Sequence, residues 1–182
     1  MMRAGRALTV LAAAAVSVTA DPARASTTGS TATTFSVTGG ALAITVPPST
    51  VNLGSASPGA QITAQLGTVQ VTDARALLTA AWTSSVTSTG FTTGGGTGPE
   101  TVANSSVSYW SGPTTTTTGS GTFAPGQANS ASAVTLASSR TAFTLAAGVG
   151  DNSASWNPTL SISVPAAAVA GAYTGTVTHS VA

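Results

Sequence analysis

Apolar and polar residues alternate with period two along most of this chain, a pattern that predicts β-strands. It is clearest near the end of the sequence, where two segments each have one apolar face and one hydroxyl-bearing face. Their apolar parities hold Trp156, Leu160, Ile162 and Val164 in the first segment and Tyr173, Val177, His179 and Val181 in the second.

Short segments of this kind recur between glycine and proline turns, and we expect strands at 34–37, 41–46, 61–66, 68–72, 80–88, 106–110, 133–136, 141–145, 159–164 and 173–181. Beyond the N-terminal apolar run, no window shows the i, i+3, i+4, i+7 spacing of an amphipathic helix. The pattern therefore predicts an all-β fold, an antiparallel β-sandwich or Greek-key-like barrel of about 8 to 10 short strands.

Two segments, 92–99 and 113–121, are rich in glycine or threonine and are expected to be flexible loops or hairpin tips. The second contains five consecutive threonines, Thr114 to Thr118. A solvated spacer is the favoured interpretation of this run, and an O-glycosylated patch is the alternative.

The N-terminus has the layout of a secretory signal peptide. Arg3 and Arg6 precede an apolar run at 7–18, and Ala23-Arg-Ala25 offers small residues for cleavage before Ser26. The run is shorter than the roughly 20 residues that span a bilayer. We expect a cleaved signal peptide at 1–25, one secreted domain at 26–182, and no membrane span after cleavage.

Charge is nearly absent after residue 25, which leaves two arginines and three carboxylates. Nucleic-acid binding needs several cationic contacts with phosphates, so nucleic acid is not an expected partner. The chain has no lysine, which excludes Schiff-base chemistry, and no cysteine, so packing alone must hold an exported domain together.

The residues that could perform catalysis are few. His179 is the single histidine, Asp73 and Asp151 are its possible partners, and no Gly-x-Ser-x-Gly motif is present. One histidine without cysteine excludes structural zinc. The oxygen-rich segment 150–153 has too few carboxylates for a calcium site and is expected to be an Asx-type turn. We predict no enzyme activity, no metal site and no cofactor.

Asp73 and Arg75 lie two residues apart at the end of an apolar strand, and we expect them to fix a corner through charge-assisted hydrogen bonds. Trp82, Tyr109, Trp110 and Trp156 could stack on sugars or belong to the core. The parity of Trp156 places it in the core, whereas one of the adjacent residues Tyr109 and Trp110 must point outward.

Three stretches resemble the WxL domain of Gram-positive cell-surface proteins. Val51-Asn-Leu-Gly54 is similar to its early strand, and Gly67-Thr-Val-Gln-Val-Thr-Asp-Ala-Arg75 leading to Trp82 is similar to its first motif region. The segment at 164–181 is similar to its C-terminal motif. Where the family has Trp-x-Leu, this chain has Trp82-Thr-Ser and His179-Ser-Val. The resemblance implies an extracellular β-domain bound noncovalently to cell-wall peptidoglycan.

Two functions are therefore expected. One is a wall-associated module that binds peptidoglycan or glycan, with Trp82, Tyr109, Trp110 and His179 as contact residues. The other is a self-assembling structural subunit of a surface layer or fibre, in which uncharged edge strands pair between copies, so that homo-oligomers or other surface proteins are the partners.

Overall fold

The computed structural model describes residues 28–48 and 50–182, and the expected signal peptide at 1–25 lies outside them. The chain divides into two units, residues 1–36 and 37–182. In the first unit, residues 28–36 are exposed and carry no assigned helix or strand. The strand expected at 34–37 is therefore wrong, because alternation alone forms no strand without a partner to complete its hydrogen bonds.

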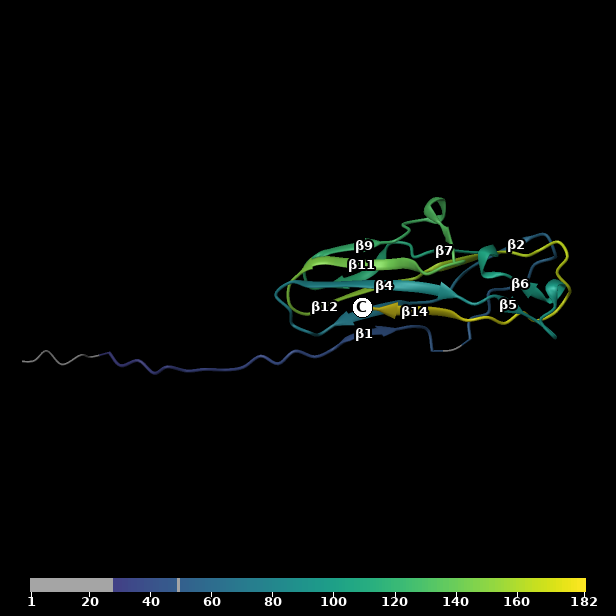
Figure 1. The fold of residues 1–182 in the computed structure, drawn as a ribbon. Helices are drawn as coiled ribbons and strands as arrows, with labels where there is room; N and C mark the ends of the chain where they lie inside the picture. The colour runs from purple at the N-terminus through teal and green to yellow at the C-terminus, as the bar shows by residue number, and fades with distance from the viewer. Residues whose placement is uncertain (1–27, 49) are drawn as a thin grey trace, which may run out of the picture. The chain divides into compact units, whose positions relative to one another are not determined.

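The second unit is built from antiparallel strands, which confirms the all-β prediction (Figure 1). In the described part of the chain there are fourteen strands. They are β1 Leu42–Thr45, β2 Gln61–Gln65, β3 Val69–Asp73, β4 Ala80–Ser88, β5 Phe91–Thr92, β6 Thr101–Val102, β7 Val107–Trp110, β8 Thr114–Thr118, β9 Thr122–Pro125, β10 Val134–Thr135, β11 Arg140–Gly148, β12 Asn152–Trp156, β13 Thr159–Ser163 and β14 Val177–Val181.

Two of the four-stranded sheets are halves of one longer layer, which we call the long sheet. Their strand orders are β1-β3-β12-β8 and β10-β7-β13-β2. Along the chain β2 leads into β3, β7 into β8 and β12 into β13, each across two or three residues. Three neighbouring strands of one half thus continue into three neighbouring strands of the other.

The breaks between the halves have local causes. Pro158 has no N–H to donate, and Gly67 and Gly112 adopt φ of 97° and 71°, which side chains disfavour. The Leu66 N–H donates to the Pro158 carbonyl at 2.8 Å. The Gly67 N–H donates to Asn157 Oδ1 at 3.1 Å, so the donors freed by the break are satisfied.

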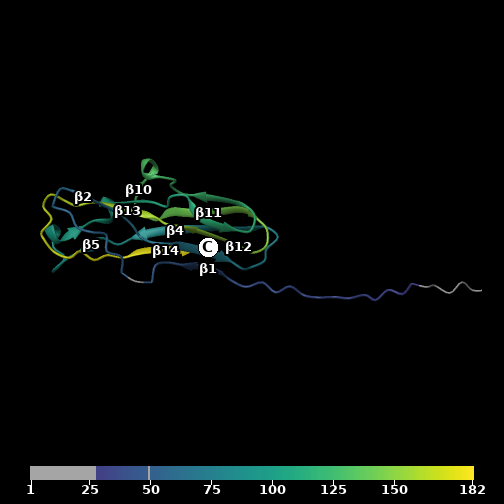
Figure 2. The ribbon, with the colours of Figure 1, turned by 180° about the vertical axis from the view of Figure 1, so that it is seen from behind.

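The opposing sheet has the order β14-β4-β11-β9; Figure 1 shows these four strands side by side, and Figure 2 shows β14, β4 and β11 from behind. The core lies between this sheet and the long sheet. Phe143 from β11 stacks on Trp156 from β12 with ring centroids 4.8 Å apart, and both side chains are fully buried. Trp156 is thus a core residue, as its parity predicts. The fold is a β-sandwich and not a closed barrel.

The threonine run corrects another expectation. Thr114–Thr118 forms β8, an edge strand paired with β12, and Thr122–Pro125 forms β9, so 113–121 is no flexible loop. Thr118 Oγ1 and Ser153 Oγ lie 2.7 Å apart across this pair. β-Branched threonine suits a half-exposed strand. The Asx-type turn expected at 150–153 is likewise replaced in part by strand, because β12 begins at Asn152.

Candidate functional site

A polar network occupies the end of the sandwich where β3, β4 and β12 meet. Asp73 is 1% exposed, and it accepts hydrogen bonds from Arg75 Nε at 2.8 Å and from an Arg75 terminal nitrogen at 2.9 Å. The same terminal nitrogen donates to the Ala81 carbonyl at 2.9 Å. Asn152 accepts from Trp82 Nε1 at 2.9 Å and is itself buried.

This network has the geometry of a structural corner. The paired guanidinium lowers the pKa of the Asp73 carboxyl, and the backbone N–H of Arg75 adds a further bond to it at 3.1 Å. The network ties β3 to the start of β4 through Ala81, and Trp82 ties β4 to β12 through Asn152. Asp73 is buried beneath its own partner and offers no free carboxylate.

Two of the four residues expected to contact a ligand are buried. Trp82 is 2% exposed and packs near Phe123 and Phe143, while Tyr109 is fully buried on the inner face of β7. Neither offers a surface for a sugar ring, which corrects that expectation. Trp110 is the outward member of the adjacent pair and is partly exposed. The four residues therefore do not form one contact surface.

His179 points from β14 into the space between the sheets. Its Nε2 lies 3.2 Å from the Tyr109 hydroxyl, and its ring packs against the Tyr109 and Trp156 rings. Burial lowers the pKa of His179 to about 4, so the ring is neutral at pH 7. Burial also raises the pKa of the Tyr109 phenol, so the pair is uncharged.

The two possible carboxylate partners of His179 are engaged elsewhere. Asp73 is paired with Arg75, and Asp151 Oδ1 accepts the Ala76 N–H at 3.1 Å. In residues 37–182 the one ion pair is that between Asp73 and Arg75. The described residues also hold no group of three or more His, Cys, Asp or Glu side chains that could bind a metal ion.

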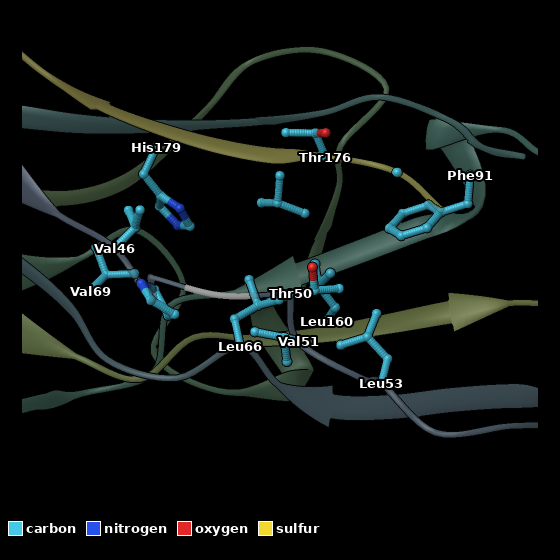
Figure 3. A pocket seen from close by; sticks show the side chains of 13 residues that line it. Val46, Thr50, Val51, Leu53, Leu66, Val69, Phe91, Leu160, Thr176 and His179 are labelled. Atoms are coloured by element: carbon cyan, nitrogen blue, oxygen red, sulfur yellow. The ribbon is translucent and has the colours of Figure 1, made fainter. Parts of the chain in front are cut away.

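An apolar cleft lies between the sheets and runs to the end opposite the polar network. Its inner cavity, of about 220 Å³, is nearer the middle of the sandwich and is lined by Val69 and His179, and its outer cavity, of about 630 Å³, lies at the far end. The two cavities share Val51, Leu53 and Phe91 among their walls. We call the two together the intersheet cleft. Figure 3 shows the His179 side chain pointing into the inner cavity, with Val51, Leu53 and Leu66 on the far wall.

The walls of the intersheet cleft come from three sheets and from two connections. Ile62 on β2 and Ile162 on β13 belong to the long sheet, and His179 on β14 belongs to the opposing sheet. Phe91 lies on β5, which pairs with β6 in a separate two-stranded sheet. The connections are the chain at 50–58, between β1 and β2, and the chain at 168–175, which leads to β14. None of the lining residues is Asp, Glu, Lys or Arg, so the cleft is uncharged.

The intersheet cleft is not evident from the sequence. The segment Val51-Asn-Leu-Gly54, which resembles an early strand of the WxL domain, forms no strand and instead lines the cleft. Ala168 and Val169 lie in a stretch with turn composition, and nothing in their spacing shows that they face Ile162 across a cavity.

No family model matches this chain, and neither the curated proteins nor the solved structures contain a match. Within residues 28–48 and 50–182, no helix is long and apolar enough to cross a membrane.

Proposed function

We propose that this protein is an extracellular, non-catalytic structural subunit that assembles with copies of itself into a surface layer or fibre. The observation that carries this proposal is the uncovered intersheet cleft, an apolar opening at one end of a sandwich whose outermost strands are uncharged. Uncharged apolar clefts are common sites at which proteins bind a partner or a ligand.

The outermost strands support self-association. The edges of the sheets are β1, β8, β10, β2, β14 and β9, and their sequences hold no Lys, Arg, Asp or Glu. Soluble proteins commonly protect such edges with charged side chains, because unpaired backbone groups are templates for another strand. The edge strands of this protein carry no charged side chains, so their unpaired backbone groups are not protected in this way.

The test is sedimentation equilibrium of residues 26–182 over a hundredfold range of concentration. The proposal expects a weight-average mass that rises with concentration, and the rise should persist in high salt because no charge pairs hold the contact. A monomer mass at every concentration would refute it.

Trp110 supports a second candidate function, the wall-binding module. Its side chain is partly exposed on the outer face of β7, two residues before the Gly112 turn, and an exposed indole ring can stack on a sugar. This function predicts that residues 26–182 pellet with peptidoglycan sacculi and that Trp110→Ala remains soluble while Trp110→Phe pellets. Equal pelleting by Trp110→Ala would remove Trp110 from the contact.

A further inference from the structure

The segment before β1 has a two-faced sequence and an exposed apolar face. We call residues 29–38 the arm. Phe35 and Val37 share one parity and are 91% and 78% exposed, whereas Thr34 and Ser36 carry hydroxyls on the other parity. The hydrophobic effect favours burial of an aromatic and a branched side chain at this spacing, and the spacing is that of a strand with one face in contact with a core.

The intersheet cleft has the matching character. It is lined by apolar side chains such as Leu53, Ile62 and Ile162 and by backbone groups, and it contains no charged residue. The arm contains none either. Neither surface therefore has to desolvate a charge when the two come together, which is the usual obstacle to burying a polar segment.

One edge strand lies beside the opening. β2 is the outermost strand of its half of the long sheet and pairs on one side with β13, and Ile62 from β2 lines the outer cavity. An extended segment beside β2 can bond to its free backbone groups while alternate side chains enter the cleft, as in recognition by strand addition.

The arm of a chain cannot fill the outer cavity of its own chain. Gly39 follows the arm and lies against the backbone of Arg75, and the Gly40 N–H donates to the Ala74 carbonyl, so this point is fixed at the end of β3. Phe35 is four residues away and reaches at most about 14 Å.

The outer cavity lies at the far end of the long sheet. Asn152 stands beside Asp73 at the arm's end, and Ile162, which lines the cleft, follows ten residues later along β12 and β13. At about 3.3 Å per residue this separation is roughly 33 Å. Phe35 and Val37 are therefore out of reach of the outer cavity of their own chain.

We propose that the arm of one copy lies in the intersheet cleft of a second copy, extended beside β2, with Phe35 and Val37 buried in the cleft and Thr34 and Ser36 facing outward. The donor and acceptor surfaces differ, and the arm is joined to the sandwich at Gly39, at the end opposite the outer cavity, so the contact is head-to-tail and extends into an open chain of subunits. This inference rests on the proposed function and names the contact that performs it.

The experiment compares four forms of the chain by sedimentation equilibrium: residues 26–182, residues 39–182, the double variant Phe35→Ser with Val37→Ser, and the matched control Thr34→Ala with Ser36→Ala. Within residues 28–48 and 50–182 every strand lies after residue 39, so circular dichroism and thermal unfolding should be alike in the four forms. Deletion of the arm and the Phe35 and Val37 double variant should each weaken association by roughly tenfold or more. The control should associate like the parent chain.

A second measurement identifies the acceptor. A synthetic peptide of residues 29–40 is added to residues 39–182, and methyl resonances of Leu53, Ile62 and Ile162 are followed by NMR. The inference expects these resonances to shift with saturation at one peptide per chain, and expects no shift with a peptide that carries serine at positions 35 and 37.

The outcomes separate the inference from the proposed function. Undiminished association of residues 39–182 would overturn the arm as donor and leave self-assembly standing. A parent chain that stays monomeric would overturn self-assembly and the inference together. Peptide-induced shifts that avoid the cleft residues would overturn the cleft as acceptor.

Discussion

His179 is the residue whose ionisation folding changes most clearly. It lies between the sheets beside Tyr109 and Trp156, and burial lowers its pKa from 6.5 to about 4. In the unfolded chain the same ring binds a proton near pH 6.5. Between pH 6.5 and pH 4 the unfolded state therefore holds more protons than the folded state, and stability falls as the pH falls through this window.

The expected result is a loss of about 2 to 3 kcal/mol in the free energy of unfolding between pH 7 and pH 4.5. Urea unfolding followed by tryptophan fluorescence measures it. His179→Gln should show a nearly flat profile over the same range. Asp73 affects stability at a lower pH than His179 does. Its lowered pKa stabilises the fold above about pH 4, and this contribution is lost as the pH falls further. An unchanged slope in His179→Gln would contradict the account.

Asp73 is the central hydrogen-bond acceptor of the polar network where β3, β4 and β12 meet. Asp73→Ala removes the acceptor of three hydrogen bonds from Arg75 and leaves Asn152 without one of its partners. We expect it to lower the free energy of unfolding by roughly 2 to 3 kcal/mol, as breaking a buried pair does. Asp151→Ala is the control, since it removes one exposed bond to the Ala76 N–H and should cost under about 1 kcal/mol. Equal losses in the two variants would show that the corner adds no stability beyond its surroundings.

At the scale of elements, alternation predicted most strands because one face of each is buried. Residues 80–88 alternate between buried and mostly exposed positions, and β4 has the predicted bounds. The same rule failed at β8, whose five threonines show no alternation, and its strand conformation depends on β12 beside it. At 34–37 the same rule predicted a strand that does not form, because this segment alternates but has no paired strand.

The candidate site was predicted less well, for a related reason. The Asp73 and Arg75 spacing on one strand end is local, so the sequence shows it directly. The burial of Trp82 depends on Phe123 and Phe143 from distant strands, and the intersheet cleft depends on two connections with no regular pattern. Neither the burial of Trp82 nor the intersheet cleft can therefore be predicted from local periodicity.

Gly126 tests one element in detail. β11 has a register shift between Thr141 and Phe143, and the Gly126 N–H donates to the Ala142 carbonyl at 2.8 Å. A Cβ at Gly126 would overlap the Thr141 carbonyl oxygen. Gly126→Ala should therefore lower the free energy of unfolding by about 3 kcal/mol. Gly98→Ala, where a Cβ meets nothing within 4 Å, should be close to neutral. Chemical denaturation of both variants measures the difference. An unchanged free energy of unfolding in Gly126→Ala would contradict the close approach of the two backbones at the bulge.

At the scale of the whole molecule, the sandwich has a filled core, a polar corner at one end and an uncharged opening at the other. The corner holds β3, β4 and β12 together next to the point where the arm leaves. The opening exposes the apolar space between the layers beside β2. Identical subunits with a donor at one end and an acceptor at the other assemble into chains without a second component.

Assembly of this kind should be insensitive to salt and sensitive to the apolar face of the arm. Raising the salt concentration to about 1 M screens charge pairs within about 3 Å and leaves apolar burial intact. Light scattering at low and high salt should therefore give the same or a larger mass. Dissociation in high salt would point to charge pairs and contradict an apolar contact.

Head-to-tail assembly through the arm is tested most sharply by a sedimentation-velocity dilution series of residues 26–182 beside residues 39–182. We expect the longer chain to sediment faster as its concentration rises, while the chain without the arm begins to associate only at concentrations at least about tenfold higher. A longer chain that sediments as a single monomer at every concentration would contradict it.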